Sequence, residues 1–300
     1  MSLLVVGTLA YDSIETPAGT AADELGGSGT HFALAANFFT AVRMMGVIGG
    51  DFRPEDRALL EEREIDLRGV GTAEGETFRW SGRYEGDCNV AETLETHLNV
   101  HGDYEPQLPP EYADSRLIFL ANGPPQQQAR VVDQARKDSF IVMDTMNFWI
   151  QNDNADLRAL LKRVDGITIN DLEARMLTGE PTLIRAGRAI LDLGPRLVWL
   201  KKGEHGAFLF SKDFFFALPA YPVSDLVDPT GAGDSFAGGL MGYLAHAGVL
   251  DEEHLRRAMV YGSVLASFNV EDFGARRVCR LQRDEIETRY RELLRFTAVA

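Results

Sequence analysis

Residues 225–239, DLVDPTGAGDSFAGG, place small residues and a carboxylate directly before an apolar stretch with helical spacing. The first amides of a helix have no intrahelical partner and carry the positive end of the helix dipole. Gly231, Ala232 and Gly233 therefore offer a candidate anion hole that little side-chain bulk blocks. Asp234 fits a general base that accepts a proton from an attacking hydroxyl while the amides stabilise a transferring phosphoryl group. The plainer alternative is a helix-start aspartate that gains only dipole stabilisation.

Other signatures limit the class of protein. The sequence contains neither GxxxxGK[ST] nor a GxGxxG that opens a helix, so no P-loop or dinucleotide-binding motif is present. A net charge of −15 argues against a general basic surface for nucleic acid, but a phosphorylated ligand needs only local amides. Cys88 and Cys279 are the only cysteines, which suggests a reducing cytoplasm and no zinc site or disulfide framework. No apolar run approaches the roughly 20 residues of a membrane helix.

Alternating apolar runs and helical segments must position these groups. Strands are predicted at 3–7, 44–50, 116–122, 140–145, 165–170 and 196–203, with helices at 29–40, 56–63, 125–137, 155–163 and 182–193. The C-terminal third is more helical, at 234–247, 254–269 and 283–296. This order predicts an α/β protein with a doubly wound, mostly parallel sheet flanked by helices. Without a repeat or a linker, residues 1–300 read as a single domain.

One segment departs from this order. In TFRWSGRYEG at 77–86, Phe78, Trp80 and Tyr84 alternate with Arg79 and Arg83 on the opposite face, which predicts a strand with one covered face. Together with the stretch at 12–24, it suggests a small antiparallel lid formed by segments at about 12–24 and 75–100. An ordinary edge hairpin is the alternative, but aromatic side chains on an edge strand need something to cover.

The glycine-rich stretch has a wider context. DPTGAGDSFAGG at 228–239 closely resembles the C-terminal signature of the PfkB (ribokinase-like) family of carbohydrate and nucleoside kinases, with Pro229 where threonine is usual. Further resemblances follow in family order: ELGGSGTHFALAANF at 24–38, MGVIGGDF at 45–52, NDLEARMLTG at 170–179 and LKKGEHGAF at 200–208. They span nearly the whole chain and are weakest in the lid and at 100–115. The resemblance implies a ribokinase-like fold and an ATP-dependent phosphotransferase that acts on a hydroxyl of a small sugar or sugar-like substrate.

The resemblance also implies roles on the phosphate side. Asp234 is the general base, and the amides of residues 231–233 cradle the γ-phosphate of ATP. Asn170 and Glu173 organise Mg²⁺ through water, which suits an ion that keeps several waters. A capped helix start, with Asn170 as N-cap and Glu173 three residues on, is compatible with that role.

Two further nucleotide-side features come from the same resemblance. Asp228 and Thr230 match positions that ligate a monovalent cation, usually K⁺, in many relatives. Either Lys201 or Lys202 reaches the phosphates, although a solvated lysine pair at a strand end is an equal alternative. The residues implied to contact the nucleotide are Lys201, Gly203, Gly206, Asn170 and Glu173.

The acceptor side is implied by the N-terminal motifs. Asp12 hydrogen-bonds substrate hydroxyls, and Gly26 and Gly27 let the sugar approach the backbone. His31 stands where ribokinases carry asparagine, which puts ribose itself in doubt and makes this histidine a candidate specificity residue. A lone histidine is, however, more often structural.

A second acceptor-side group follows the predicted strand at 140–145. Asp144 and Asn147 lie at the carboxyl end of that strand, where ligands gather in a doubly wound sheet. A capped loop is the competing interpretation. Phe148 and Trp149 read as core or pocket wall.

Three functional hypotheses remain open. The leading one is a kinase for a small sugar-like substrate, and the aromatic face with Trp80 leaves a nucleoside acceptor as an alternative. Arg79 and Arg83 on the other face suit an anionic acceptor instead. A catalytically silent regulatory protein on the same fold is the alternative of another class. We also expect a cytoplasmic protein that binds no nucleic acid or membrane, and a possible homodimer through the lid.

Overall fold

The computed structural model describes residues 1–298, and its main sheet contains nine strands within that range. They are β1 (Leu3–Val6), β4 (Val42–Ile48), β5 (Asp66–Thr72), β8 (Leu117–Leu120), β9 (Phe140–Asp144), β10 (Gly166–Asn170), β11 (Leu197–Lys201), β12 (Ala207–Phe210) and β13 (Phe215–Leu218). Their spatial order is β13-β12-β11-β10-β9-β8-β1-β4-β5. Neighbours from β11 to β5 pair in parallel, and β12 and β13 extend the sheet in antiparallel fashion.

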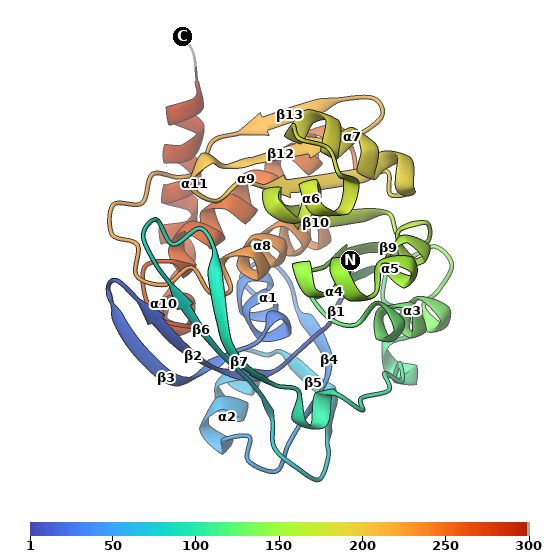
Figure 1. Cartoon of the computed structure of the whole chain (residues 1–300), viewed down its shortest axis with the longest axis vertical. Coiled ribbons are helices and arrows are strands. Elements are labelled where there is room, and N and C mark those ends of the chain that lie inside the picture. Colours follow the sequence, from blue (N-terminus) through green and yellow to red (C-terminus); the bar gives the residue numbers. More distant parts are fainter. Residues whose placement is uncertain (299–300) are drawn as a thin grey trace.

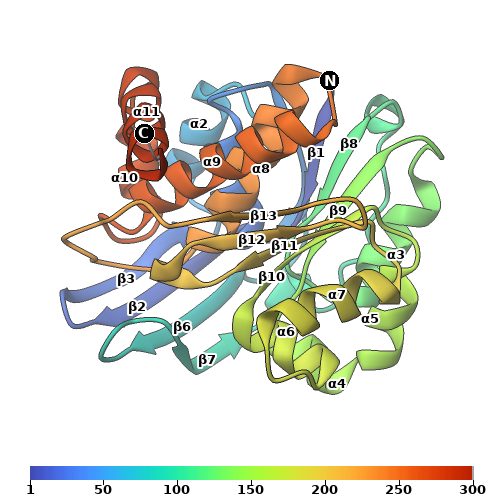
Figure 2. The same cartoon turned by 90° about the horizontal axis from the view of Figure 1, so that it is seen from above.

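Helices cover both faces of this sheet (Figures 1 and 2). One face carries α1 (Ser28–Ala36), α2 (Pro54–Glu62), α8 (Ala232–Ala247), α9 (Glu252–Asn269), α10 (Arg276–Arg280) and α11 (Arg283–Thr297). The other carries α3 (Pro125–Gln134), α4 (Asn147–Asn152), α5 (Asn154–Leu161), α6 (Asp171–Thr178) and α7 (Leu183–Leu193). The prediction of a doubly wound, mostly parallel sheet is therefore confirmed.

Adjacent residues of the central strands enter opposite cores. In β1, Leu3 and Val5 pack with α1, α8 and α9, whereas Leu4 belongs to the core under α3 to α7. In β11, Trp199 points to the first core and Leu200 to the second. Strands buried on both faces need apolar residues at every position, which explains the continuous apolar runs in the sequence.

A second, four-stranded sheet forms a lid (Figure 1). Its strands are β2 (Ala10–Thr16), β3 (Gly19–Gly26), β6 (Phe78–Tyr84) and β7 (Ala91–His97), in the order β3-β2-β6-β7. The two outer pairs are antiparallel, but β2 and β6 pair in parallel. The expectation of a purely antiparallel lid was therefore wrong. Because β2 follows β1 and β6 follows β5, and those strands lie in one parallel sheet, β2 and β6 leave it in the same direction.

No helix within residues 1–298 is both long enough and apolar enough to cross a membrane.

Candidate active site

The carboxyl ends of three neighbouring strands bring polar side chains together. Asp144 ends β9, Asn170 ends β10 and Lys201 ends β11, and the parallel register pairs Asn170 with Lys201. Nζ of Lys201 donates to Oδ2 of Asp144 at 3.1 Å, and both side chains are largely buried. The sequence predicted Asp144 at this edge from its place at a strand end, where ligands of doubly wound sheets bind, whereas Asn170 and Lys201 came from the family resemblance.

The glycine-rich loop enters α8 at the same edge. Gly231 is the N-cap residue and takes a left-handed conformation, with φ of 75°. The amide of Ala232 donates to the carbonyl of Pro229 at 3.1 Å, so it is engaged within the loop. Within residues 1–298, no acceptor binds the amides of Gly231 and Gly233. The structure therefore leaves two of the three predicted amides free for an anion.

Asp234 lies in the first turn of α8 beside these amides. Burial raises its pKa well above the ordinary value, the nearby Asp144 carboxylate raises it further, and the Lys201 ammonium opposes both. A side-chain carbon on Gly233 would lie 2.9 Å from Nζ of Lys201, so this ammonium sits at the rim of the anion hole. A carboxylate with a raised proton affinity therefore adjoins a cation and two free amides.

Asn170 and Glu173 form the capping box that their spacing predicted. Oδ1 of Asn170 accepts from the Glu173 amide at 2.8 Å, and Oε2 of Glu173 accepts from the Asn170 amide at 2.9 Å. Burial raises the pKa of Glu173 to about 7, although the neighbouring Lys201 opposes the effect. Oε1 of Glu173 has no protein partner among the described residues, so capping leaves one carboxylate oxygen for a ligand.

The oxygen atoms here suit Mg²⁺ held through water. Residues 1–298 contain no group of three or more His, Cys, Asp or Glu side chains that could enclose a metal ion. Mg²⁺ commonly keeps several waters and uses one or two carboxylates together with substrate phosphates. Glu173 beside the anion hole fits that pattern.

Asp228 and Thr230, the predicted cation ligands, hold the loop in place. Asp228 is fully buried, and its two oxygens accept from the amides of Thr230 and Gly274, each at 2.8 Å. Oγ1 of Thr230 donates to the hydroxyl of Tyr84, from lid strand β6, at 3.2 Å. These bonds tie the loop to a neighbouring turn and to the lid, and the K⁺ role stays a prediction.

Asp12, in lid strand β2, marks the acceptor side. Its carboxylate is buried and accepts from the Gly27 amide at 3.3 Å. A side-chain carbon on Gly26 would lie 2.0 Å from Oδ2 of Asp12, and Gly27 has a φ of 92°. Gly26 therefore makes room for this carboxylate, whereas a side-chain carbon on Gly27 would lie 2.6 Å from the carbonyl oxygen of Thr8. Burial raises the pKa of Asp12 to about 7, against the opposing effect of the Gly27 amide.

The lid register decides which predicted face looks toward the site. Paired residues of parallel strands share a face, and β2–β6 pairing sets Trp80 opposite Asp12 and Arg79 opposite Tyr11. Trp80 therefore shares the face of Asp12, while the Arg79 guanidinium lies 5.3 Å from the centroid of the Tyr11 ring. On the same face as Trp80, Tyr84 reaches the glycine-rich loop. The aromatic face, and not the arginine face, is turned toward the site.

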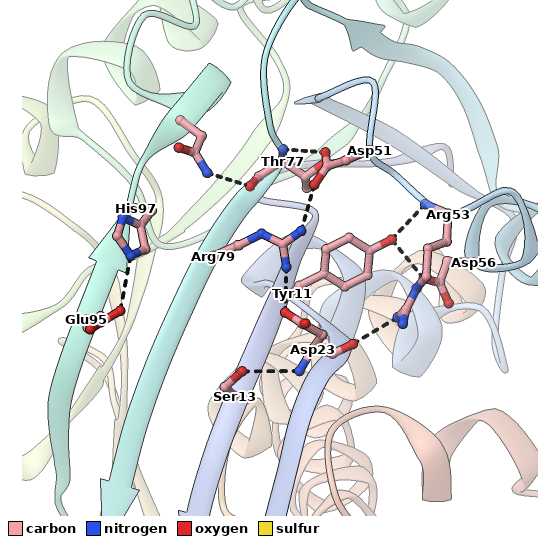
Figure 3. Close-up of polar contacts among 11 residues, drawn as sticks. Tyr11, Ser13, Asp23, Asp51, Arg53, Asp56, Thr77, Arg79, Glu95 and His97 are labelled. Carbon is pink, nitrogen blue, oxygen red and sulfur yellow. Dashed lines mark hydrogen bonds and ion pairs between the residues drawn. The ribbon is translucent and has the colours of Figure 1, made fainter.

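The arginine face fastens the base of the lid to the main sheet (Figure 3). Arg79 donates to Oδ2 of Asp51 at 2.8 Å and also pairs with Asp23. Oδ1 of Asp51 accepts from both the amide and the hydroxyl of Thr77, each at 2.7 Å. The hydroxyl of Tyr11 accepts from the amide of Arg53 at 2.8 Å. The MGVIGGDF motif thus supplies an anchor for strand β6.

The turn after β11 contacts the tip of the lid. Gly203 and Gly206 have φ of 53° and 86°, and a side-chain carbon on Gly206 would lie 2.0 Å from the carbonyl oxygen of Leu218. A carbon on Gly203 would lie 2.5 Å from Oδ1 of Asn89, in the β6–β7 turn. Nζ of Lys202 lies 3.9 Å from the centroid of the Phe208 ring, so Lys201 is the lysine that faces the site.

The remaining predicted residues lie away from the cluster formed by Asp144, Lys201 and Asp234. His31 is 2% exposed, behind the glycine-rich loop, and burial lowers its pKa to about 4. Asn147 is exposed, and its Oδ1 accepts from the Phe148 amide at 2.9 Å, as in the capped-loop interpretation. Phe148 is 51% exposed, so it does not belong to the core. Trp149 is half-buried and donates to Asn122 at 3.0 Å.

Sequence reasoning missed Tyr84 as a loop contact and Asn269 altogether. Nδ2 of Asn269, in α9, donates to the carbonyl of Thr230 at 2.6 Å, and its Oδ1 accepts from Ser235 at 2.9 Å. Asn269 lies at the end of an amphipathic helix, 35 residues beyond Asp234, and no local spacing links it to the loop. The aromatic alternation around Tyr84 was the available signal for the lid contact.

The fold and the site together define a phosphotransferase with an alcohol group as acceptor. The chain belongs to the pfkB family of carbohydrate kinases, whose family model matches residues 2–282. As a member, it is an ATP-dependent kinase with a ribokinase-like fold.

Individual relatives agree with this placement. The chain is 28% identical to a cytidine kinase of Thermococcus kodakarensis over 258 residues, which cover 84% of this chain and 91% of the relative. A nucleoside kinase of Burkholderia thailandensis, solved with inosine, superposes with a TM-score of 0.80 at 21% identity, covering 97% of this chain and 98% of that one. An E. coli protein described as a ribokinase II, solved with ATP and Mg²⁺, gives 0.80 at 18% identity, covering 97% and 99%.

Proposed function

We propose that this kinase transfers the γ-phosphoryl group of ATP to a sugar hydroxyl of a nucleoside. The observation that carries the proposal is the lid face shared by Asp12 and Trp80. A carboxylate on that face suits ribose hydroxyls, and an indole beside it suits a flat base. The similarity to a cytidine kinase over most of the chain adds support.

The indole of Trp80 lies flat against the lid sheet. A side-chain carbon on Gly82 would lie 2.1 Å from Cη2 of Trp80, so the ring lies along the strand over this glycine. Its Nε1 donates to Oγ1 of Thr93, in the neighbouring strand β7, at 3.3 Å. Both contacts hold the ring against the lid sheet and leave its other face for a ligand. Stacking of a base on an aromatic side chain contributes about 1–3 kcal/mol.

The chemistry follows from the groups around the loop. Asp12 orients the acceptor, and Asp234 accepts the proton of the attacking hydroxyl as the new oxygen–phosphorus bond forms. The amides of Gly231 and Gly233, with the Lys201 ammonium, stabilise the negative charge on the transferring phosphoryl group. Mg²⁺, when held beside Glu173, neutralises charge on the phosphates. The raised pKa of Asp234 makes its carboxylate a stronger base than an ordinary aspartate.

The lid completes this arrangement. Its contacts with Thr230 and with the Gly203 turn close the site at both ends, through Tyr84 and Asn89. Closure excludes water, which otherwise competes with the acceptor as nucleophile.

The decisive experiment is an ADP-release assay with MgATP, with and without K⁺, across nucleosides, free sugars, sugar acids and sugar phosphates. We expect release with nucleosides, a product of nucleoside monophosphate mass, and loss of release in Asp234→Asn. Release with free sugars alone would replace the nucleoside proposal by a sugar kinase. No release with any acceptor, despite measurable ATP binding, would favour the regulatory alternative.

The lid also carries the proposed homodimer contact. Every residue of edge strand β7 is exposed, and Val90 and Leu98 beside it are 64% and 45% exposed. An exposed strand edge with apolar neighbours is a template for pairing with a second chain. Light scattering should give twice the mass of one chain, and Leu94→Lys in β7 should return the mass to that of a monomer.

A further inference from the structure

A buried histidine stands directly behind the anion-hole loop. A side-chain carbon on Gly231 would lie 2.4 Å from Cγ and Nδ1 of His31 and 2.5 Å from its Cδ2. These three ring atoms at nearly equal distances place the flat side of the imidazole against the Gly231 backbone. The ring therefore occupies the space that any larger residue at position 231 would need.

Asn269 supports the loop from the same side. It is fully buried, and it connects the carbonyl of Thr230 to the hydroxyl of Ser235. Asn269 is also a polar neighbour of the His31 ring, and its contact opposes the effect of burial on the pKa of His31. Three helices thus meet behind the loop: α1 supplies His31, α8 supplies Ser235 and α9 supplies Asn269.

The polar atoms of His31 are incompletely satisfied. Both ring nitrogens are buried, and neither makes a hydrogen bond of ordinary geometry among residues 1–298, although Asn269 lies near the ring. Incomplete pairing of a buried polar group is unfavourable. The shape of the ring, rather than hydrogen bonding, is therefore the feature that contacts the loop.

The loop needs external support because its sequence provides little. Glycine populates left-handed and right-handed conformations about equally, so Gly231, which precedes α8, does not fix its own conformation. The left-handed conformation of Gly231, with φ of 75° and ψ of 0°, sets how the free amides of Gly231 and Gly233 are presented at the start of α8. A rigid ring behind Gly231 removes the freedom to rotate away.

We propose that His31 is a positioning residue for phosphoryl transfer, which acts through Gly231 and together with Asn269 holds the two free amides toward the γ-phosphate. The inference rests on the proposed role of this loop as the anion hole. It differs from direct contact with the acceptor, the role predicted from the sequence. It also holds whether the acceptor is a nucleoside or a free sugar.

The first test measures nucleotide affinity by calorimetry and needs no acceptor. Because the loop cradles the γ-phosphate, His31→Ala should weaken ATP binding about tenfold while ADP binding changes little. His101, another buried histidine whose pKa burial lowers to about 4, is the matched control because it packs against Phe78 and Tyr104. His101→Ala should leave the ATP-to-ADP affinity ratio unchanged. An unchanged ratio in His31→Ala would overturn the proposal.

The second test covers the case in which His31→Ala does not fold. Asn269→Ala removes the other support, and His31→Phe keeps the flat ring without its nitrogens. Asn269→Ala should lower the ATP-to-ADP affinity ratio, whereas His31→Phe should leave that ratio near the wild-type value, both with circular dichroism like that of the wild type. If the folded Asn269→Ala variant keeps the wild-type ratio, the loop positions itself and the proposal fails.

The third test is a double-mutant cycle on turnover, with whichever acceptor the panel identifies. Gly231→Ala alone brings a methyl group into the imidazole and should reduce kcat strongly. In the His31→Ala background the same change should reduce kcat about tenfold less, because the methyl group has space. Equal losses in both backgrounds would contradict contact through Gly231. Failure of the nucleoside proposal appears separately, as a panel without nucleoside turnover.

Discussion

The glycine-rich loop at 228–234, which is the proposed catalytic loop, and the lid are held in opposite ways. The loop is enclosed by α1, α8 and α9, and buried groups such as Asp228 and Asn269 fix its backbone through short hydrogen bonds. The lid is fixed at its base by ion pairs such as Arg79–Asp51, and its outer strand β7 is exposed throughout. Elements with few buried apolar contacts open locally at lower free energy than core elements.

This contrast assigns different tasks to the two regions. Stabilising a transferring phosphoryl group requires donors held in place before the reaction, and we propose that the enclosed loop supplies them. Admitting and releasing an acceptor requires movement, which the lid can make without disturbing the loop. Asp12 and Trp80 lie on the lid, so we expect the moving part to choose the acceptor and the fixed part to perform the transfer.

The largest effect on phosphoryl transfer should come from removing the proposed general base in the loop. Asp234→Asn keeps the shape of the side chain but cannot accept the proton, so kcat should fall about 10²- to 10⁴-fold while the KM for ATP changes little. Steady-state ADP release measures both values. Turnover within a few-fold of the wild type would remove Asp234 from the mechanism.

A smaller effect should separate the metal role of Glu173 from its capping role. Glu173→Gln keeps an acceptor for the Asn170 amide but loses the charge, so the Mg²⁺ concentration for half-maximal activity should rise about 10- to 100-fold. A Mg²⁺ titration at fixed ATP checks this shift. The opposite pattern, a lower melting temperature with an unchanged Mg²⁺ requirement, would leave Glu173 with capping alone.

Loosening the lid should have a milder effect, on the acceptor only. Arg79→Met removes the ion pairs with Asp51 and Asp23, and the acceptor KM should rise about fivefold with little change in kcat. Arg83→Met is the matched control, because Arg83 pairs with the exposed Glu15 and Glu92 away from the lid base. Equal effects of the two variants would show that the base contacts have no special role.

The smallest expected effect is on how the stability of the folded protein changes with pH. The pKa of Asp12 and that of Glu173 are about 7 in the folded protein and lie near 4 in an unfolded chain, so the folded state binds more protons between these values. Stability of the ligand-free protein should therefore fall as the pH rises from about 4 to 7 and level off above that range, by a few degrees in melting temperature. Asp12→Asn should flatten the profile, and a profile unchanged by that variant would contradict the assignment.

The sequence predicted the elements that apolar burial defines. Strands such as β1 and β11 are buried on both faces and read as continuous apolar runs, and α9 and α11 have long helical spacing. Strand β5 was not predicted because its sequence, DLRGVGT, lies at the sheet edge and contains two glycines. The direction of β6 relative to β2 depends on the main sheet, which no local pattern records.

The residues of the candidate site also divide into those that local sequence predicts and those that depend on the folded structure. Asp234, Asn170 and Glu173 could be predicted because neighbours in the sequence carry the signal, as in the capping box. The place of His31 depends on its contact with Gly231, 200 residues further along the chain. The engaged amide of Ala232 depends on the backbone geometry of the turn from Pro229, which residue types alone do not specify. Phe148 is exposed because α4 has only six residues and buries Ile150 instead.

The most direct measurement compares kcat/KM for a nucleoside and for ribose, in the wild type and in Trp80→Leu. The account predicts that the wild type prefers the nucleoside. In Trp80→Leu the preference should shrink about 5- to 150-fold, the equivalent of 1–3 kcal/mol of stacking, through a higher nucleoside KM. The kcat/KM for ribose should stay unchanged. A preference for ribose in the wild type, or a nucleoside preference that survives Trp80→Leu intact, would contradict the division between a catalytic loop and a selecting lid.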